Sequence, residues 1–224
     1  FTRNGDPRDY YRALGENEAD LSLAQAYGRG LSHLYGNEAD KAVVTFMRLR
    51  QQYPEVMAFH TALGQAQLAT GRTPEALGTL EHALELAPRN VPVTVRYGEA
   101  LLQAGRAKRA HEVLLDLFNN VPPTQEQIRL TAMAANAAGD VADAYSYMAE
   151  YHLMGGDLML AINQLELALS VPSITDQQRA KFVARLKEVR EWLPKERNRS
   201  KKPPDGQRSP DSPGSPGWAR DDVP

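Results

Sequence analysis

The chain has 224 residues, a formal net charge of -2 and no cysteine. The lack of cysteine excludes disulfides, cysteine-ligated zinc and thiol nucleophiles, and the near-neutral charge gives no reason to expect nucleic acid as a partner. No apolar run approaches the roughly 18 residues that span a bilayer, so we expect no insertion into a membrane.

The first 20 residues are polar, and the chain opens at Phe1 without a methionine or a charged and then apolar leader. Such a start is typical of a sequence that has been cut from a longer one. We therefore expect residues 1–20 to be a linker, or a partial helix, that follows a missing upstream domain.

From residue 23 onward, small residues and prolines return with a period of 34 residues. Four columns share this spacing: Pro54, Pro88 and Pro122; Ala42, Ala76, Ala110 and Ala144; Gly30, Gly64 and Gly98, continued by Ala132; and Gly71, Gly105 and Gly139, begun by Asn37. This period is typical of the tetratricopeptide repeat, a pair of antiparallel helices. The sequence predicts an all-α solenoid with repeats at 23–56, 57–90, 91–124 and 125–158.

Each column has a physical role in such a repeat. Small residues allow two helices to cross closely, and glycine between the helices can take the left-handed conformation that ends the first one. Asn37 is the best substitute there, because asparagine tolerates that conformation. Within the second repeat, we expect Thr73 to be the N-cap and Pro74 the first helical residue. One large-residue position should fill the space between helices: Phe46, Leu80, Leu114 and Met148.

The period changes towards the C-terminus. Ala144 is followed by Ala161 after only 17 residues, with Gly156 at the turn between them. Half a repeat is skipped, so the helix around 142–154 should be the second helix of one pair and the first helix of the next. We expect an atypical C-terminal half instead of an even superhelix.

A last helix and a proline-rich tail complete the chain. Thr175 and Gln178 form a capping box that begins a terminal helix, which should run to Trp192 before Pro194 ends it. The repeat domain therefore covers residues 21–193. Residues 194–224 are rich in proline and poor in apolar residues, so we expect them to be disordered.

The chain lacks the usual sequence patterns of catalytic sites. None of the five histidines belongs to a His-Glu-x-x-His motif, which would place two imidazoles on one metal ion. Gly-x-Ser-x-Gly and phosphate-loop patterns are also missing. We therefore predict no catalytic residue, no metal ligand and no cofactor in this chain, and interpret the histidines as packing or surface residues.

Helical-repeat proteins bind other polypeptides on the concave surface that their first helices form. Repeat positions 2, 5, 9, 12 and 13 predict the following groove residues: Ala24, Tyr27, Leu31, Leu34, Tyr35, Thr61, Gln65, Leu68, Val95, Glu99, Leu102, Gln103, Arg129, Met133 and Asn136. This set is mainly apolar and contains a few polar side chains. It contains a single cation, so it is not a clamp for a carboxylate. It suits an extended or helical protein segment, or a neighbouring domain. An equally simple interpretation is that Tyr27, Leu31 and Leu34 only pack beneath the N-terminal segment.

The stretch from about 19 to 193 resembles the C-terminal repeat region of the β-barrel assembly-enhancing proteases. The resemblance is carried by AQAYGRGLSHLYGNEADKAVVTFMRL, by VTVRYGEALLQAGRAKRAHEVL and above all by AEYHLMGGDLMLAINQLELAL, with its skipped half-repeat and following helix. It implies a periplasmic protein whose zinc ion and His-Glu-x-x-His motif lie in a protease domain N-terminal to the repeats.

The resemblance also implies partners for the repeats: the outer-membrane β-barrel assembly machinery, its stalled barrel substrates and the protease domain itself. No residue of this chain matches the zinc ligands, so only an interaction role transfers. The alternative is a stand-alone repeat scaffold, cytosolic or periplasmic, without a protease. A third hypothesis, a peptidase activity of residues 1–224 themselves, predicts chelator-sensitive cleavage, which we do not expect.

Overall fold

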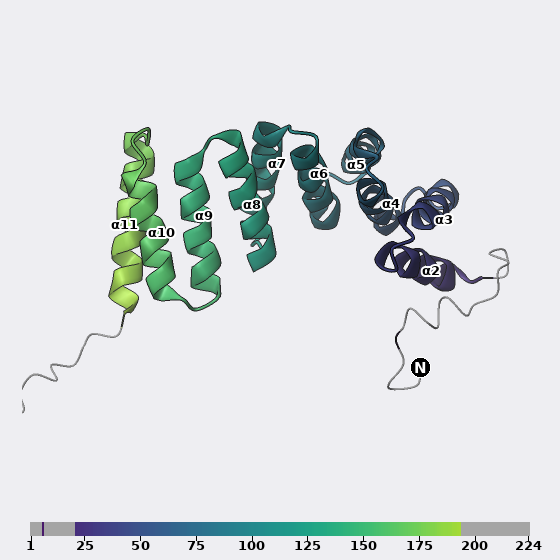
Figure 1. Ribbon diagram of the computed structural model, residues 1–224, viewed down its shortest axis with the longest axis horizontal. Coiled ribbons are helices and arrows are strands. Elements are labelled where there is room, and N and C mark those ends of the chain that lie inside the picture. The colour runs from purple at the N-terminus through teal and green to yellow at the C-terminus, as the bar shows by residue number, and fades with distance from the viewer. Residues whose placement is uncertain (1–5, 7–20, 194–224) are drawn as a thin grey trace, which may run out of the picture. The chain divides into compact units, whose positions relative to one another are not determined.

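The computed structural model describes residue 6 and residues 21–193. Regular structure in this part of the chain is entirely α-helical, and the helices follow one another from α2, purple in Figure 1, to α11, yellow-green. The described helices are α2 (Leu23–Tyr35), α3 (Ala39–Gln52), α4 (Met57–Ala69), α5 (Thr73–Leu86), α6 (Val91–Gln103), α7 (Ala107–Asn120), α8 (Gln125–Ala138), α9 (Val141–Met154), α10 (Leu158–Ser170) and α11 (Asp176–Trp192). The predicted linker, apart from residue 6, and the predicted tail lie outside the described residues.

Consecutive helices form the predicted antiparallel pairs. Each helix packs against the next one along the chain, and the first helices of successive pairs also touch, α2 with α4, α4 with α6 and α6 with α8. These four first helices therefore form one continuous row. Contacts that are confined to neighbouring units define a helical-repeat solenoid, which confirms the predicted fold class.

Glycines on the first helices allow the close crossings. A β-carbon added at Gly64 would stand 2.7 Å from the Leu80 side chain, and one added at Gly30 would stand 2.5 Å from Phe46. Gly98 and Leu114 repeat this relationship at 2.9 Å. All three large side chains are fully buried, as predicted. Their counterpart in the fourth repeat, Met148, is only half-buried.

The turns between paired helices use the predicted left-handed conformation. Gly71 has φ +74° and Asn37 has φ +66°, so asparagine replaces glycine in the first repeat without a change of backbone. The Arg72 N–H, just beyond the turn, donates to the Gln67 carbonyl at 2.8 Å and thereby closes α4. Arg89 also has a positive φ, of +60°, which the repeat pattern does not predict.

The predicted cap at Thr73 is wrong. Helix α5 already includes Thr73 as its first residue; Arg72 precedes it, and no side chain caps this end. Because the left-handed turn at Gly71 brings the chain directly into α5, Thr73 and Pro74 both lie inside the helix. The other expected cap is confirmed, since Thr175 and Gln178 form a capping box at the start of α11.

Helix α9 marks the change of period. It pairs with α8 and with α10, and it also contacts α11, which is the contact that first helices make in the earlier repeats. Ala149 of α9 and Leu165 of α10 are separated by the same 16 residues as Gly64 and Leu80, and both are fully buried. Helix α9 therefore belongs to two pairs at once, as the 17-residue spacing predicts.

Helix α11 covers the last pair with a single apolar stripe. Its buried residues are Phe182, Leu186 and Val189, which lie on one face at helical spacing. Arg185 donates from two nitrogens to the Glu150 carboxylate of α9, each at 2.7 Å, and its guanidinium lies 5.2 Å from the centre of the Trp192 ring. Packing and a bidentate ion pair thus both hold α11 on α9.

Candidate protein-binding groove

A groove of about 380 Å³ lies between the first helices α2 and α4 and the start of α6. Five of the predicted site residues line it: Tyr27, Leu31, Tyr35, Thr61 and Gln65. Met57, Asn90 and Pro92 line the part of the groove that lies at the N-termini of α4 and α6. We call this surface the α2–α4 groove.

The two tyrosines of the α2–α4 groove have different environments. Tyr27 is half-buried, and its ring packs against Phe46 and Phe59 with centroid distances of 5.8 and 5.5 Å. Burial raises the pKa of Tyr27, and nearby Tyr35 adds to the rise. Tyr35 itself is 59% exposed. Tyr27 therefore forms the floor of the groove and Tyr35 its accessible wall.

The polar groups of the groove are neutral. The Gln65 amide donates to the Tyr35 hydroxyl at 3.4 Å, a long and weak hydrogen bond that a bound chain could replace. The Thr61 hydroxyl donates back to the Met57 carbonyl at 2.9 Å, so its proton is used within α4. Among the described residues that line the groove, none carries a formal charge. Recognition here must depend on shape, apolar contact and neutral hydrogen bonds.

Three other predicted groove residues, one of them buried and two partly buried, do not line the α2–α4 groove. Leu34 is 9% exposed and lies within the buried cluster of the first repeat. Leu68 and Leu102 are partly buried and pack against the cluster between the second and third repeats. Position in the repeat predicts the helix face only approximately, because the neighbouring first helix covers one edge of that face.

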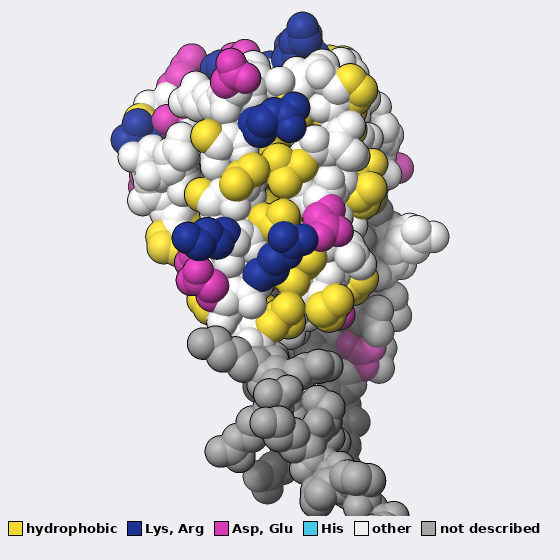
Figure 2. Space-filling view, turned by 90° about the vertical axis from the view of Figure 1, so that its left-hand side faces the viewer, with side chains coloured by type: hydrophobic (Ala, Val, Ile, Leu, Met, Phe, Trp, Pro, Cys, Tyr) yellow, Lys and Arg dark blue, Asp and Glu magenta, His cyan; other side chains and the backbone are white. Residues whose placement is uncertain are grey.

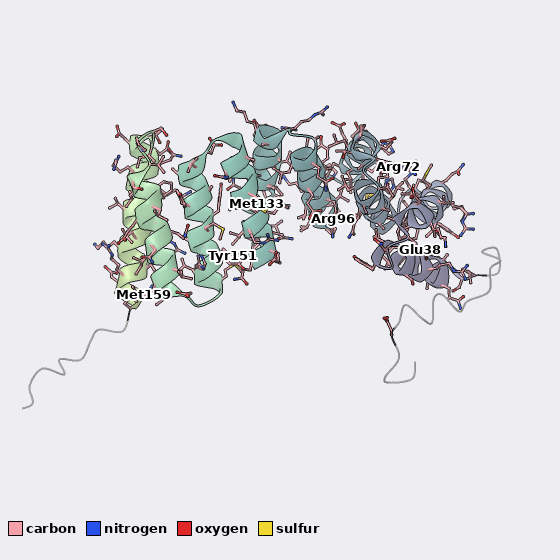
Figure 3. All side chains as sticks on the ribbon, in the orientation of Figure 1. Glu38, Arg72, Arg96, Met133, Tyr151 and Met159 are labelled. Atoms are coloured by element: carbon pink, nitrogen blue, oxygen red, sulfur yellow. The ribbon has the colours of Figure 1, made fainter. Side chains whose placement is uncertain are left out.

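The remaining predicted residues lie outside the α2–α4 groove, Ala24 on α2 and the others on α6 and α8. Val95 is half-buried, and Glu99 accepts from Arg96 at 2.6 Å. On α8, Arg129 donates to Glu126 at 3.0 Å and approaches the Met133 sulfur at 3.7 Å. Met133 is 51% exposed, and Asn136 is also exposed. Figure 3 labels Arg96 and Met133 on these two helices.

A partly buried polar cluster, which no sequence motif predicts, lies between the third and fourth repeats. His111 of α7 contacts Asp140 through Nδ1 at 2.9 Å and the Tyr147 hydroxyl through Nε2 at 3.2 Å. An ionised Asp140 only accepts, so Nδ1 donates to it and Nε2 accepts from the tyrosine. Burial, with Asp143 and Asp140 nearby, raises the pKa of Tyr147 to about 12. The partners are 29 and 36 residues from His111, beyond any local motif.

A second apolar surface lies on the helices at the C-terminal end of the solenoid. Figure 2 views this end and shows apolar side chains between basic and acidic ones. The exposed large apolar residues of α10 and α11 are Met159, Leu160, Leu167, Val183 and Trp192. Unlike the α2–α4 groove, this surface includes charged neighbours such as Arg190, which pairs with Glu166.

The described residues contain no group of three or more His, Asp or Glu side chains that could hold a metal ion. Within residues 21–193, no helix combines the length and the apolar character that a bilayer crossing requires.

Comparison with protein families agrees with the helix pairs. Residues 18–55 and 67–135 each match a family model described as tetratricopeptide repeat. The class of protein follows from the fold and these matches together: the described chain is a solenoid of tetratricopeptide repeats, which act by binding proteins.

The particular relatives are more distant. β-Barrel assembly-enhancing proteases of Escherichia coli (strain K12) and Shigella flexneri are each 26% identical to this chain over 168 residues. The match covers 75% of this chain and 34% of each relative, so the chain spans about a third of their length.

Solved structures share the fold alone. A crystal structure of MamA has a TM-score of 0.55 at 13% identity, covering 76% of this chain and 96% of that chain. MamA from Desulfovibrio magneticus RS-1 has a TM-score of 0.54 at 16% identity, covering 84% of this chain and 97% of that one.

Proposed function

We propose that the α2–α4 groove is the protein-binding site of this repeat module and that it holds an extended segment of a partner protein. The observation that carries the proposal is the uncharged lining, in which the exposed Tyr35 ring stands beside the amide of Gln65. An aromatic ring offers contact area at a small cost in side-chain entropy, and an amide can pair with the backbone of a bound chain.

We further propose that the module serves a periplasmic zinc metallopeptidase. The support is the 26% identity to β-barrel assembly-enhancing proteases, together with the half-repeat at α9. Its partners would then be the outer-membrane barrel assembly machinery, stalled barrel substrates and the protease domain. The described residues do not fit a zinc site, so the zinc would belong to a domain outside this chain.

A stand-alone scaffold is the second candidate, and it is favoured by the likeness to MamA, whose solved chains are covered almost completely by this fold. The two candidates differ in what precedes Phe1 in the gene. A signal peptide with a His-Glu-x-x-His domain supports the protease module. A gene that encodes the repeats without a protease domain supports the scaffold.

The groove is tested by site-specific crosslinking in the complete protein. A photoreactive amino acid at Tyr35 should crosslink to a component of the barrel assembly machinery or to a barrel substrate, and Gln65→Lys should reduce that product several-fold. The matched control is the same photoreactive residue at Val44, which is 67% exposed on α3. Equal crosslinking from both positions would refute the groove assignment. Tyr27 is a poor test position, because its ring supports the core.

A further inference from the structure

The α2–α4 groove combines three features that suit a proline-rich segment. It has an aromatic wall at Tyr35, and its floor contains the Tyr27 ring and Leu31. Its polar groups include the carboxamides of Gln65 and Asn90, and Asn90 uses its side-chain oxygen to accept from the Val93 N–H. The Asn90 amide nitrogen remains as a donor, and the Gln65 amide nitrogen has a second hydrogen besides the one that it donates to the Tyr35 hydroxyl. Uncharged, aromatic-lined grooves with neutral donors are the sites that bind polyproline II segments.

The sequence of the chain itself contains a proline-rich segment. In SPDSPGSPG, residues 209–217, the prolines Pro210, Pro213 and Pro216 stand at every third position. A polyproline II helix has three residues per turn, so a segment with this spacing would present its three rings along one edge when it adopts that form.

The prolines of the segment are spaced more closely than the two tyrosines of the groove. Successive prolines would lie about 9 Å apart at 3.1 Å per residue. Tyr27 and Tyr35 are eight residues apart on α2, which corresponds to about 12 Å along the helix axis. The segment has one charged residue, Asp211, and the groove lining has none. Binding would therefore not bury a group of unpaired charges on either side.

We propose that the α2–α4 groove binds the proline-rich segment 209–217 of a second copy of this chain. The inference rests on the proposed function, since it assumes that this groove accepts polypeptide. Helix α2 contacts α3 and α4, whereas α11, which precedes the segment, contacts α9 and α10. The groove lies on the first described helices, and α11 is the last described helix before the segment in the sequence, which favours a head-to-tail contact between copies. A copy held in this way competes with other partners for the groove.

The test uses the full chain and two variants that each remove one side of the contact. The tail variant carries Pro210→Ala, Pro213→Ala and Pro216→Ala; the groove variant carries Tyr35→Ala and Gln65→Lys. Sedimentation equilibrium should show that the wild type self-associates with rising concentration, and that each variant alone does so at least tenfold more weakly. An equimolar mixture should form a one-to-one dimer, because one variant supplies the groove and the other supplies the prolines.

Three outcomes would overturn the proposal: a wild type that stays monomeric, a tail variant that self-associates like the wild type, or a mixture that stays monomeric. If the segment bound the groove of its own chain, the wild type would stay monomeric, and this result too would overturn the proposal. Val44→Ala is the control for a surface change elsewhere, and circular dichroism confirms that the variants fold. If self-association fails the test while Gln65→Lys still weakens crosslinking at Tyr35, only this inference falls. If the groove substitutions change neither the self-association nor the crosslinking at Tyr35, both this inference and the proposed function are wrong.

Discussion

Gly64 of α4 and Leu80 of α5 are packed so closely that a β-carbon on the glycine would stand 2.7 Å from the leucine side chain. Gly64→Ala must therefore displace Leu80 or separate the two helices. Such overpacking costs about 1–3 kcal/mol, and the better helix propensity of alanine offsets about 1 kcal/mol at most. We expect a net loss of about 1–2 kcal/mol in the free energy of unfolding, measured by urea denaturation.

The matched control is Gly78, in the middle of α5. It is exposed, and a β-carbon there would meet nothing within 4 Å. Gly78→Ala should stabilise the protein by up to about 1 kcal/mol. Combining Gly64→Ala with Leu80→Ala should cost less than the sum of the two single changes, because the clash is then relieved. If Gly64→Ala were as stable as Gly78→Ala, the close crossing would be wrong.

The left-handed turns give a second prediction. Gly71 has φ +74°, so Gly71→Ala should lower the stability by about 1–2 kcal/mol, although a β-carbon there meets no neighbouring atom. Asn37→Gly should leave the stability nearly unchanged or raise it slightly. Thermal unfolding of both variants is the measurement. A neutral Gly71→Ala would show that the turn can adopt another conformation.

His60 should make the protein less stable in mild acid. Its side chain is buried; Nε2 donates to the Pro54 carbonyl at 2.8 Å, and Nδ1 is buried without a partner. Burial lowers the pKa of His60 below the ordinary value of 6.5. As the pH falls through 6.5, the unfolded chain takes up a proton that the folded chain does not, so stability decreases.

Urea denaturation between pH 7.5 and 5 checks the effect of His60. His60→Gln should lower the stability at neutral pH and flatten its decrease towards acid. The control is His82→Gln, because His82 is exposed, with its ring 6.1 Å from that of His60. A His60→Gln variant with an unchanged slope would assign the acid sensitivity to other groups.

Helix α11 should depend on the ion pair between Arg185 and Glu150. Arg185→Lys keeps the charge but cannot make both hydrogen bonds, so we expect a loss of about 1 kcal/mol. Trp192 fluorescence reports the change directly, since the Arg185 guanidinium lies 5.2 Å from the ring centre. Arg190→Lys, at the more exposed pair with Glu166, should change stability by less. Equal effects of the two changes would show that the bidentate geometry is unimportant.

The sequence predicts the repeat frame because the frame depends on positions that few residue types can fill. Gly64 and Leu80 must be small and large at one crossing, and Gly71 must have a positive φ, so the 34-residue columns record the fold. The half-repeat at α9 could be predicted for the same reason, from Ala144 and Ala161. The start of α5 could not be predicted in the same way. The residue at which a helix begins after a turn depends on backbone hydrogen bonds, and several sequences can form these.

The groove is predictable only in part. Tyr27 and Tyr35 line it as expected, whereas Leu34 is buried, and the sequence alone does not say how far one helix covers the next. The contact of His111 with Tyr147 joins residues of different repeats, so no periodic pattern records it. Periodicity thus predicts the arrangement of the helices. The side-chain contacts between different repeats can be identified only from the structure.

The double use of α9 limits the length of the row of first helices. Within residues 21–193, the first helices that follow one another are α2, α4, α6 and α8, because the next contact of this kind joins α9 to α11. Helices packed about 8–10 Å apart give such a row a span of roughly 30 Å, and an extended chain covers that distance with about nine residues. The shared helix therefore ends the row at α8, and we expect a longer bound segment to extend beyond it.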